Sequence, residues 1–253
     1  MSYIETLDWV TEAYRSILKN NLVGIYVHGS IAMKCFHWDK SDIDFLVVVD
    51  EKLSKDSKKK LMDVIMDMNA YVPQKGLEMS VVLKKDCMDF KYPTYFDLHY
   101  SIAHRNWYLN DPEDYCNKMH GEDKDLAAHF MITRNFGITW YGQPIDKVFG
   151  PVPKEHYLDS IMEDIKNAKE SIMVDTMYIV LNLCRVLAYT KEELIFSKEQ
   201  GGKWGLDRLD KKYHNIIAQA LYCYKTDKMM IFDKKEAQDY CDYMLAQMEI
   251  TPK

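Results

Sequence analysis

The sequence predicts an α+β protein, with an α/β N-terminal half over residues 1–150 and an all-helical C-terminal half over residues 151–253. Three observations carry this prediction. Short apolar runs alternate with amphipathic segments in the first half, as strands and helices do. Glycine and proline cluster between residues 141 and 153, where they break regular structure. After this cluster we find only helical periodicity, so we place a domain boundary there.

The elements of the first half follow from the spacing of their apolar residues. Short β-branched and aromatic runs indicate strands, and apolar residues three or four apart indicate helices. The aromatic-rich segment Tyr92–Tyr108 is interpreted as helix plus loop. Elsewhere we expect helices over Tyr3–Leu18, Ser54–Ala70 and Asp125–Ile138, and strands over Leu22–Val27, Ile43–Val49 and Leu77–Leu83.

The second half shows no convincing strand. Its apolar residues predict three long helices, over His156–Tyr189, Lys203–Tyr224 and Lys234–Met248.

Composition narrows the class of protein. The 253 residues carry 33 positive and 39 negative charges, a formal net charge of −6. Net acidity argues against a nucleic-acid binder and suits a small cationic partner. The first 16 residues do not resemble a signal peptide, and no stretch is long and apolar enough to span a membrane. The six cysteines have no C-x-x-C spacing, so we expect reduced thiols and a cytoplasmic protein.

The most informative pattern is Gly29-Ser30 followed by Asp42 and Asp44 at the start of a strand. Residues two apart in a strand point to the same face, so the two carboxylates project together. Their mutual repulsion is relieved by a divalent cation, and Mg²⁺ prefers such oxygen ligands. A glycine lets backbone N–H groups approach phosphate, and the serine hydroxyl adds a donor. Either pattern alone is usually turn or capping chemistry, whereas their conjunction favours a metal–phosphate site.

These residues resemble the signature of the DNA polymerase β-type nucleotidyltransferase superfamily. Within it, the chain is similar to the aminoglycoside O-adenylyltransferases that modify spectinomycin and streptomycin. The resemblance implies a polymerase β-like domain with a mixed sheet and flanking helices, followed by a helical bundle. Further segments match the family at similar spacing: Leu77–Val82, Lys91–Pro93, Asp125–Ala127, Gly142, Pro151–Pro153, Asp175, Val180–Arg185, Ser197–Glu199 and Trp204.

Glu78 is a lone carboxylate in its predicted strand. It shares a face with Ser80 and Val82, opposite the apolar face. Such a charge is usually just solvated, but beside the Asp42–Asp44 strand it could converge on the same cleft. The resemblance implies that Glu78 is the general base that deprotonates the antibiotic hydroxyl.

The resemblance also implies roles for the remaining site residues. Asp42 and Asp44 would hold one or two Mg²⁺ ions, and Gly29 and Ser30 would cradle the β- and γ-phosphates of the co-substrate ATP. Arg185 and Lys198 would counter the charge of the triphosphate from the helical half.

Asp175 lies in an apolar stretch that the periodicity makes helical. A buried carboxylate needs a partner, either an internal Arg or Lys or a substrate ammonium. The resemblance favours the substrate ammonium.

The implied reaction is Mg-dependent transfer of AMP from ATP to a hydroxyl of an aminoglycoside-type antibiotic, with release of pyrophosphate. Three positions depart from the family pattern: Lys34 replaces a glycine, Ala103 a tryptophan and Ser171 an acidic residue. The last two are streptomycin contacts in the family, so spectinomycin, modified at its 9-hydroxyl, is the preferred acceptor. Streptomycin, another small acceptor, and a non-catalytic nucleotide-binding protein remain alternatives, and the oligomeric state is open.

Overall fold

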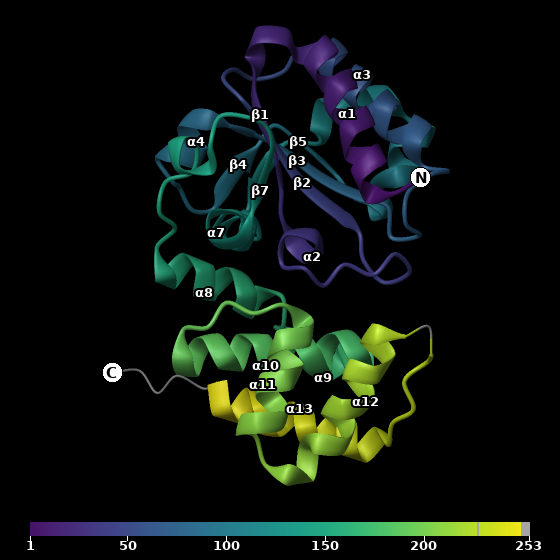
Figure 1. The fold of residues 1–253 in the computed structure, drawn as a ribbon, viewed down its shortest axis with the longest axis vertical. Helices are drawn as coiled ribbons and strands as arrows, with labels where there is room; N and C mark the ends of the chain where they lie inside the picture. Colours follow the sequence, from purple (N-terminus) through teal and green to yellow (C-terminus); the bar gives the residue numbers. More distant parts are fainter. Residues whose placement is uncertain (227, 249–253) are drawn as a thin grey trace. The chain divides into compact units, whose positions relative to one another are not determined.

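The computed structural model describes residues 1–226 and 228–248. The chain divides into two compact units, Met1–His156 and Tyr157–Lys253, which we call the N-terminal and C-terminal units. The N-terminal unit is built around a sheet, and the described part of the C-terminal unit is helical (Figure 1). This agrees with the predicted α+β class.

The N-terminal unit contains a five-stranded mixed sheet of order β5-β3-β2-β1-β7. The central strands β2 and β3 are parallel, and every other pair is antiparallel. The strands are β1 (Leu22–Val27), β2 (Ile43–Val49), β3 (Leu77–Leu83), β5 (Leu98–Tyr100) and β7 (Ile138–Gly142), and a separate ribbon pairs β4 (Thr94–Phe96) with β6 (Gly121–Asp123).

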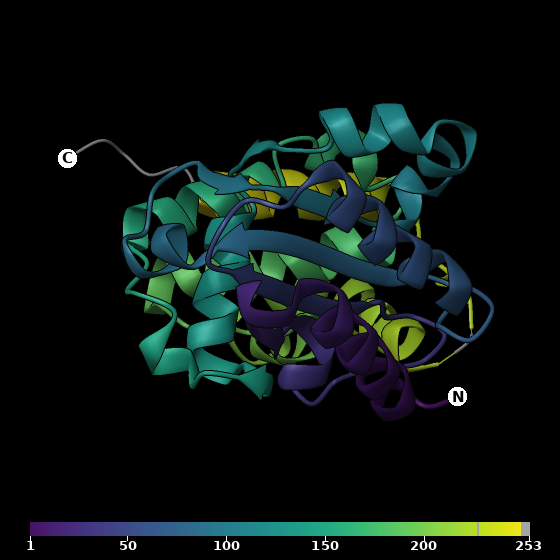
Figure 2. The ribbon, with the colours of Figure 1, turned by 90° about the horizontal axis from the view of Figure 1, so that it is seen from above.

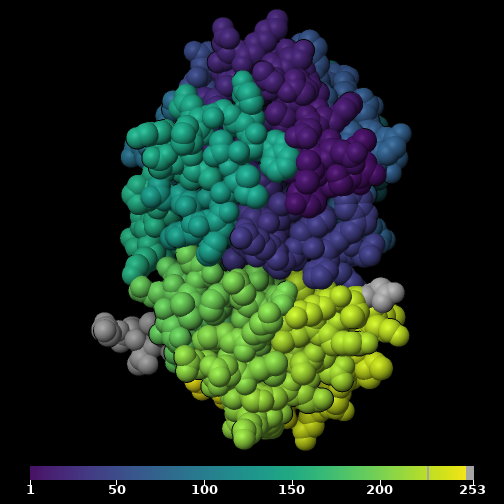
Figure 3. Space-filling model, viewed as in Figure 1, coloured from purple at the N-terminus to yellow at the C-terminus, as the bar shows by residue number. Residues whose placement is uncertain are grey.

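Helices α1 (Tyr3–Leu18) and α3 (Lys55–Met68) cover one face of the sheet and lie side by side (Figures 1 and 2). Each begins where a serine satisfies the first N–H groups. Ser2 forms a reciprocal capping box with Glu5, and Ser54 accepts a hydrogen bond from the backbone N–H of Ser57. The outer face of α1 stays at the surface of the N-terminal unit (Figure 3).

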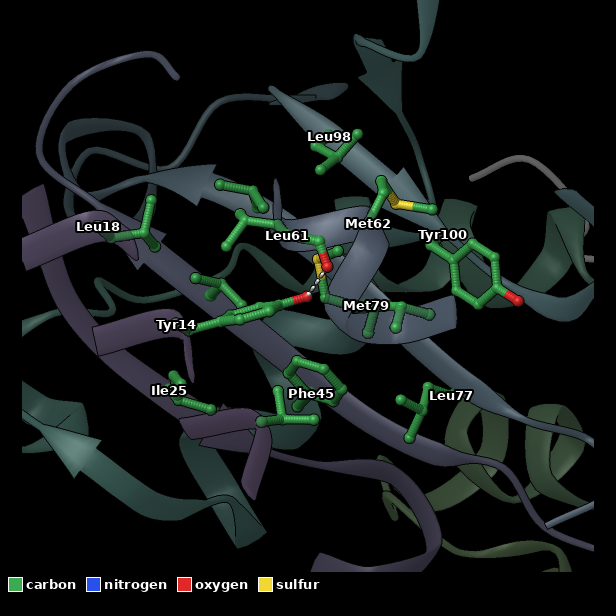
Figure 4. Close-up of a cluster of buried hydrophobic side chains, with 14 of the residues drawn as sticks. Tyr14, Leu18, Ile25, Phe45, Leu61, Met62, Leu77, Met79, Leu98 and Tyr100 are labelled. Atoms are coloured by element: carbon green, nitrogen blue, oxygen red, sulfur yellow. Dashed lines mark hydrogen bonds between the residues drawn. The ribbon is translucent and has the colours of Figure 1, made fainter. Parts of the chain in front are cut away.

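The main hydrophobic core fills the space between these two helices and the sheet. Phe45, Met79 and Tyr14 are at most 1% exposed, and the hydroxyl of Tyr14 donates to the carbonyl of Leu61 at 3.3 Å (Figure 4). Burying such side chains supplies most of the stabilisation of the sheet. The opposite face is covered too, because Tyr26 packs edge-on against Phe149. The strands β2 and β3 are therefore largely apolar on both faces, and their carboxylates stand only where they begin.

Two expectations for the N-terminal unit are wrong. Residues 92–108 contain the strands β4 and β5 as well as the start of the helix α5 (Arg105–Asn110). The strand β7 runs into the glycine- and proline-rich segment at residues 141–153, where we placed the domain boundary. Three-residue strands are too short to show an alternating pattern. The edge strand β7 is exposed or half-buried along its length and ends at Gly142. Its residues therefore show no alternation of apolar and polar side chains.

The remaining elements of the N-terminal unit are short. They are α2 (Gly29–Ala32), α4 (Lys84–Met88), α6 (Pro112–Lys118), α7 (Leu126–Phe136) and the 3-10 turns Lys19–Asn21, Ile102–His104 and Ile145–Lys147.

The C-terminal unit packs its helices around α10 (Thr176–Glu192). The expected single helix over 156–189 is three helices, because the chain turns after Glu163 and again before Asp175. The others are α8 (Lys154–Glu163), which begins in the N-terminal unit, α9 (Ala168–Ser171), α11 (Lys198–Arg208), α12 (His214–Lys225) and α13 (Lys234–Met248), with a 3-10 turn at Lys211–Tyr213.

Helix α11 approaches α10 closely because three of its glycines face that helix or its neighbours. A Cβ atom at Gly201 would meet the Cγ of Arg185 at 2.7 Å, and one at Gly205 would meet the Sγ of Cys184 at 2.8 Å. Glycine at these positions therefore sets the spacing of the two helices. All six cysteines are buried and none forms a disulfide, and within the described residues no helix meets the length and apolarity that a bilayer span requires.

Candidate active site

The beginnings of β2 and β3 bring three carboxylates together. The strands are parallel and paired in register, so Asp44 lies directly beside Glu78. Asp42 precedes the strand and points to the same face as Asp44. One oxygen of each of Asp42, Asp44 and Glu78 can be chosen so that all three lie within 4.8 Å of one another. Ser80 and Val82, which share the face of Glu78, are 3% and 0% exposed, so this face is covered rather than solvated.

The close packing around the three carboxylates changes the pKa of Glu78. Burial raises the pKa of the Glu78 carboxyl above its ordinary value, and the negative charge of Asp42 adds to the effect, while His129 opposes it. Three half-buried carboxylates whose oxygens converge form a donor set that suits a hard divalent cation.

Gly29 follows β1 and lies against Asp44. Its φ of +57° is left-handed, and a Cβ atom there would stand 1.8 Å from Oδ2 of Asp44. Both observations require glycine. The backbone N–H of His28 donates to the carbonyl of Asp44 at 3.1 Å and fixes this turn beside β2. Ser30 Oγ is a buried polar atom without a hydrogen-bond partner among the residues that the structure describes. A phosphate oxygen is a suitable acceptor for it.

Lys34 also adopts a left-handed backbone, with φ of +58°. The family resemblance places a glycine here, and the conformation that favours glycine is present although the residue is lysine. The turn is therefore retained, at the modest strain that a non-glycine residue bears in this region.

His129, on α7, is a site residue that the sequence did not indicate. Its Nε2 lies 3.2 Å from Oδ2 of Asp125 and 3.9 Å from Oε1 of Glu78, and its ring packs against that of His28 at 4.6 Å. Burial alone would lower the pKa of His129, but Asp125, Glu78 and Asp44 together raise it to about 10. The imidazolium therefore helps to keep Glu78 ionised. Only the four-residue spacing from Asp125 could have hinted at this contact.

Arg185 and Lys198 lie in the C-terminal unit. The Nε of Arg185 donates to the carbonyl of Phe196 at 2.9 Å, and its Nη1 donates to Oδ1 of Asn182 at 2.8 Å. Lys198 begins α11, and its ammonium lies 4.8 Å from the centroid of the Tyr178 ring. A small hollow adjoins Arg185, lined by Tyr157, Ile161, Asp164, Asn182, Arg185, Val186 and Phe196.

Asp175 is not buried, so that expectation is wrong. It is exposed and stands at the N-cap of α10, where its Oδ1 accepts a hydrogen bond from the N–H of Tyr178 at 3.4 Å. The helix predicted over this region is interrupted before Asp175, and α10 begins directly after it. The apolar residues on the two sides of Asp175 suggested burial, but those before it lie in the turn after α9 and those after it lie on α10.

Two family models match the chain. Residues 12–92 match the model described as "Polymerase beta, Nucleotidyltransferase", and residues 147–247 match "Aminoglycoside adenylyltransferase, C-terminal domain". With the fold and the carboxylate cluster, these matches define the protein as a nucleotidyltransferase. It belongs to the aminoglycoside adenylyltransferase family, whose two domain types follow one another along this chain.

Individual relatives agree with this membership. An aminoglycoside (3'')(9) adenylyltransferase of Rhizobium radiobacter is 25% identical over 194 residues, 74% of this chain and 71% of the relative. A spectinomycin 9-adenylyltransferase of Staphylococcus aureus is 24% identical over 218 residues, 85% and 80% of the two chains. The fold is similar to the crystal structure of a spectinomycin adenyltransferase from Enterococcus faecialis with ATP and spectinomycin, at a TM-score of 0.83 and 20% identity over 99% and 100% of the chains.

Proposed function

We propose that the protein transfers AMP from ATP to a hydroxyl of spectinomycin and releases pyrophosphate. The observation that carries the proposal is the convergence of Asp42, Asp44 and Glu78 beside the Gly29-Ser30 turn. The activities that the names of the relatives state, and the ATP and spectinomycin in the similar crystal structure, support the same reaction.

Asp42 and Asp44 are the proposed ligands of Mg²⁺. The fit rests on their oxygen donors, on the room that Gly29 leaves beside Asp44, and on the unpartnered hydroxyl of Ser30. Bound Mg²⁺ supplies positive charge that offsets the charge of the triphosphate and of the leaving pyrophosphate. Gly29 and Ser30 would hold the β- and γ-phosphates, with Oγ of Ser30 donating a hydrogen bond.

Glu78 is the proposed general base. It takes the proton of the acceptor hydroxyl, whose oxygen forms a bond to the α-phosphorus as the bond from that phosphorus to the bridging oxygen breaks. A base must be ionised to do this, and His129 favours the ionised form of Glu78. Because the parallel register holds Glu78 beside Asp44, its orientation is set before any substrate binds.

Arg185, Lys198 and Asp175 are the proposed contributions of the C-terminal unit. The two cations would bind phosphate oxygens through charge-assisted hydrogen bonds. The exposed carboxylate of Asp175 would bind a substrate ammonium, since its capping bond to Tyr178 is a single long hydrogen bond.

Spectinomycin, through its 9-hydroxyl, is the proposed acceptor. Ala103 is a small side chain exposed on a 3-10 turn, and Ser171, at the end of α9, is uncharged. Neither can supply the stacking surface or the carboxylate that the resemblance associates with streptomycin.

Mass spectrometry of the two antibiotics, incubated separately with the protein, ATP and Mg²⁺, tests the proposal. We expect spectinomycin to gain the mass of one adenylyl group and streptomycin to remain unmodified. A modified streptomycin would contradict the assignment of the acceptor. If neither antibiotic changed while ATP still bound, adenylyl transfer to these antibiotics would be wrong.

A further inference from the structure

Asp164 connects two of the residues that neighbour the predicted phosphate ligands. It lies in the turn after α8, exposed, and each of its carboxylate oxygens accepts one hydrogen bond from α10. The hydroxyl of Tyr178 donates to Oδ1 at 2.9 Å, and Nδ2 of Asn182 donates to Oδ2 at 2.7 Å. Tyr178 and Asn182 are four residues apart on one helix, so they present their polar groups on the same side.

One branch runs from Asp164 to Arg185. Asn182 is 1% exposed, and because its amide nitrogen donates to Asp164, its amide oxygen is turned toward Nη1 of Arg185. The carbonyl of Phe196 holds the Nε of Arg185, and the absence of a side chain at Gly201 leaves room for the Cγ. The guanidinium is thereby fixed, and its remaining N–H groups have a defined direction.

The other branch runs from Asp164 to Lys198. Burial raises the pKa of Tyr178 above its ordinary range, and Asp164 adds to the shift, so the hydroxyl stays protonated and can donate to Asp164. The anchored ring lies under the ammonium of Lys198, 4.8 Å from Nζ to the ring centroid. A cation over an aromatic face is held by the ring quadrupole without losing its charge.

We propose that Asp164 is a positioning residue that orients both Arg185 and Lys198 for the triphosphate of ATP. This inference rests on the proposed function, because it takes these two cations as phosphate ligands. The two hydrogen bonds of Arg185 described above go to neutral acceptors, the Asn182 amide and the Phe196 carbonyl. Asp164 therefore orients Arg185 through the neutral amide of Asn182. These contacts do not neutralise the positive charge of the guanidinium, which can act on the phosphates.

A carboxylate near a triphosphate site also has an opposing effect, since its charge repels the nucleotide. The two effects are separable by substitution. Asp164→Ala removes the hydrogen bonds and the charge. Asp164→Asn removes the charge but keeps a carbonyl oxygen for Asn182 and an amide that can donate to the Tyr178 hydroxyl. Glu163→Ala is the matched control, because it removes an exposed carboxylate one residue away that pairs with Lys166.

The test is equilibrium binding of ATP with Mg²⁺, measured by calorimetry together with melting temperatures. We expect Asp164→Ala to weaken ATP binding by about 3- to 10-fold, with a melting curve that still shows one cooperative transition well above the assay temperature. Asp164→Asn and Glu163→Ala should bind ATP at least as well as the unsubstituted protein. In an Arg185→Ala/Lys198→Ala background, Asp164→Ala should weaken ATP binding no further. Tyr178→Phe should give part of the loss.

Four results would overturn the inference. Stronger ATP binding by both Asp164 variants would mean that repulsion dominates. An equal loss in the Arg185→Ala/Lys198→Ala background would mean that Asp164 acts elsewhere. A normal affinity of Arg185→Ala/Lys198→Ala itself would remove these cations from the ATP site, and with them the corresponding part of the proposed function. If Arg185→Ala/Lys198→Ala loses affinity for ATP while Asp164→Ala does not, only the inference about Asp164 fails and the proposed function stands.

Discussion

The carboxylate cluster of the N-terminal unit and the cation pair of the C-terminal unit are built by different means. Asp42, Asp44 and Glu78 are placed by strand pairing, because a parallel register fixes which residues stand side by side. Arg185 and Lys198 are held by side-chain contacts: Arg185 with Asn182 on its own helix and with the carbonyl of Phe196, and Lys198 with Tyr178 on α10. Groups positioned by strand pairing can therefore be predicted from short sequence patterns, whereas groups positioned by successive side-chain contacts cannot.

The carboxylate cluster depends on Gly29, whose substitution gives the largest expected effect among variants that keep all three carboxylates. Gly29→Ala places a methyl group against Asp44 and forces a left-handed alanine. We expect kcat/KM for AMP transfer to fall on the order of 100-fold, the usual consequence of a catalytic group misplaced by about 1 Å.

Gly76→Ala is the matched control. Gly76 has a φ of +81°, but its nearest neighbour to an added Cβ is Ile102 at 3.5 Å, an ordinary contact. Both variants should lose about 1–2 kcal/mol of stability to backbone strain, and only Gly29→Ala should also lose turnover. Equal turnover of the two variants would contradict the role of the Gly29–Asp44 contact.

The cation pair depends on geometry as well as charge. Arg185→Lys keeps the positive charge but loses the bonds of the guanidinium to Asn182 and Phe196. We expect the dissociation constant for ATP to rise about 10-fold, whereas Arg208→Lys, on the exposed end of α11, should leave it unchanged. An unchanged affinity of Arg185→Lys would show that charge alone is sufficient.

The smallest expected effects concern stability, and they have opposite signs in the two regions. Burial raises the pKa of Glu78, whereas hydrogen bonds from Lys203 and Lys225 lower the pKa of Glu199. In metal-free protein at pH 7, Glu78→Gln should therefore increase the free energy of unfolding. Glu199→Gln should decrease it, by no more than about 1 kcal/mol, since the ion pairs of Glu199 are partly exposed.

The pH dependence follows from the same shifts. A raised carboxyl pKa costs stability above the folded value, and this cost disappears as the pH falls to the unfolded value of 4.5. A lowered pKa gives stability that is present above 4.5 and is lost as the pH falls through the lower folded value. Thermal unfolding of Glu78→Gln and Glu199→Gln, measured from pH 7 to below pH 4.5, checks both signs. Melting temperatures at pH 7 that change in the same direction for both variants would refute the opposite effects expected here.

The sequence predicted the strands β1, β2 and β3 with their observed ends, because their β-branched runs are bounded by turn residues. It also predicted the helical second half from the spacing of its apolar residues, and the mixed sheet through the family resemblance. The contacts of His129 and the turn that breaks the helix before Asp175 were not predicted. The contact of His129 with Glu78 depends on how α7 packs against β3, and the turn before Asp175 falls within a continuous apolar pattern that gives no sign of it.

The exposure of Asp164 and its two hydrogen bonds to α10 could not be predicted either, for the same reason. The assigned roles of the eight residues singled out from the sequence, from Gly29 to Lys198, remain predictions. Substitutions at Gly29, Glu78, Arg185 and Lys198 test four of them.

Single-turnover AMP transfer by Glu78→Gln tests the central claim most directly, because the variant removes the proposed base and keeps Asp42 and Asp44. With the variant saturated with ATP and Mg²⁺, we predict that ATP binds with normal affinity and that adenylyl-spectinomycin forms about 100- to 10,000-fold more slowly than with the unsubstituted protein. Formation of the product at a near-normal rate would contradict the assignment of Glu78 as the base.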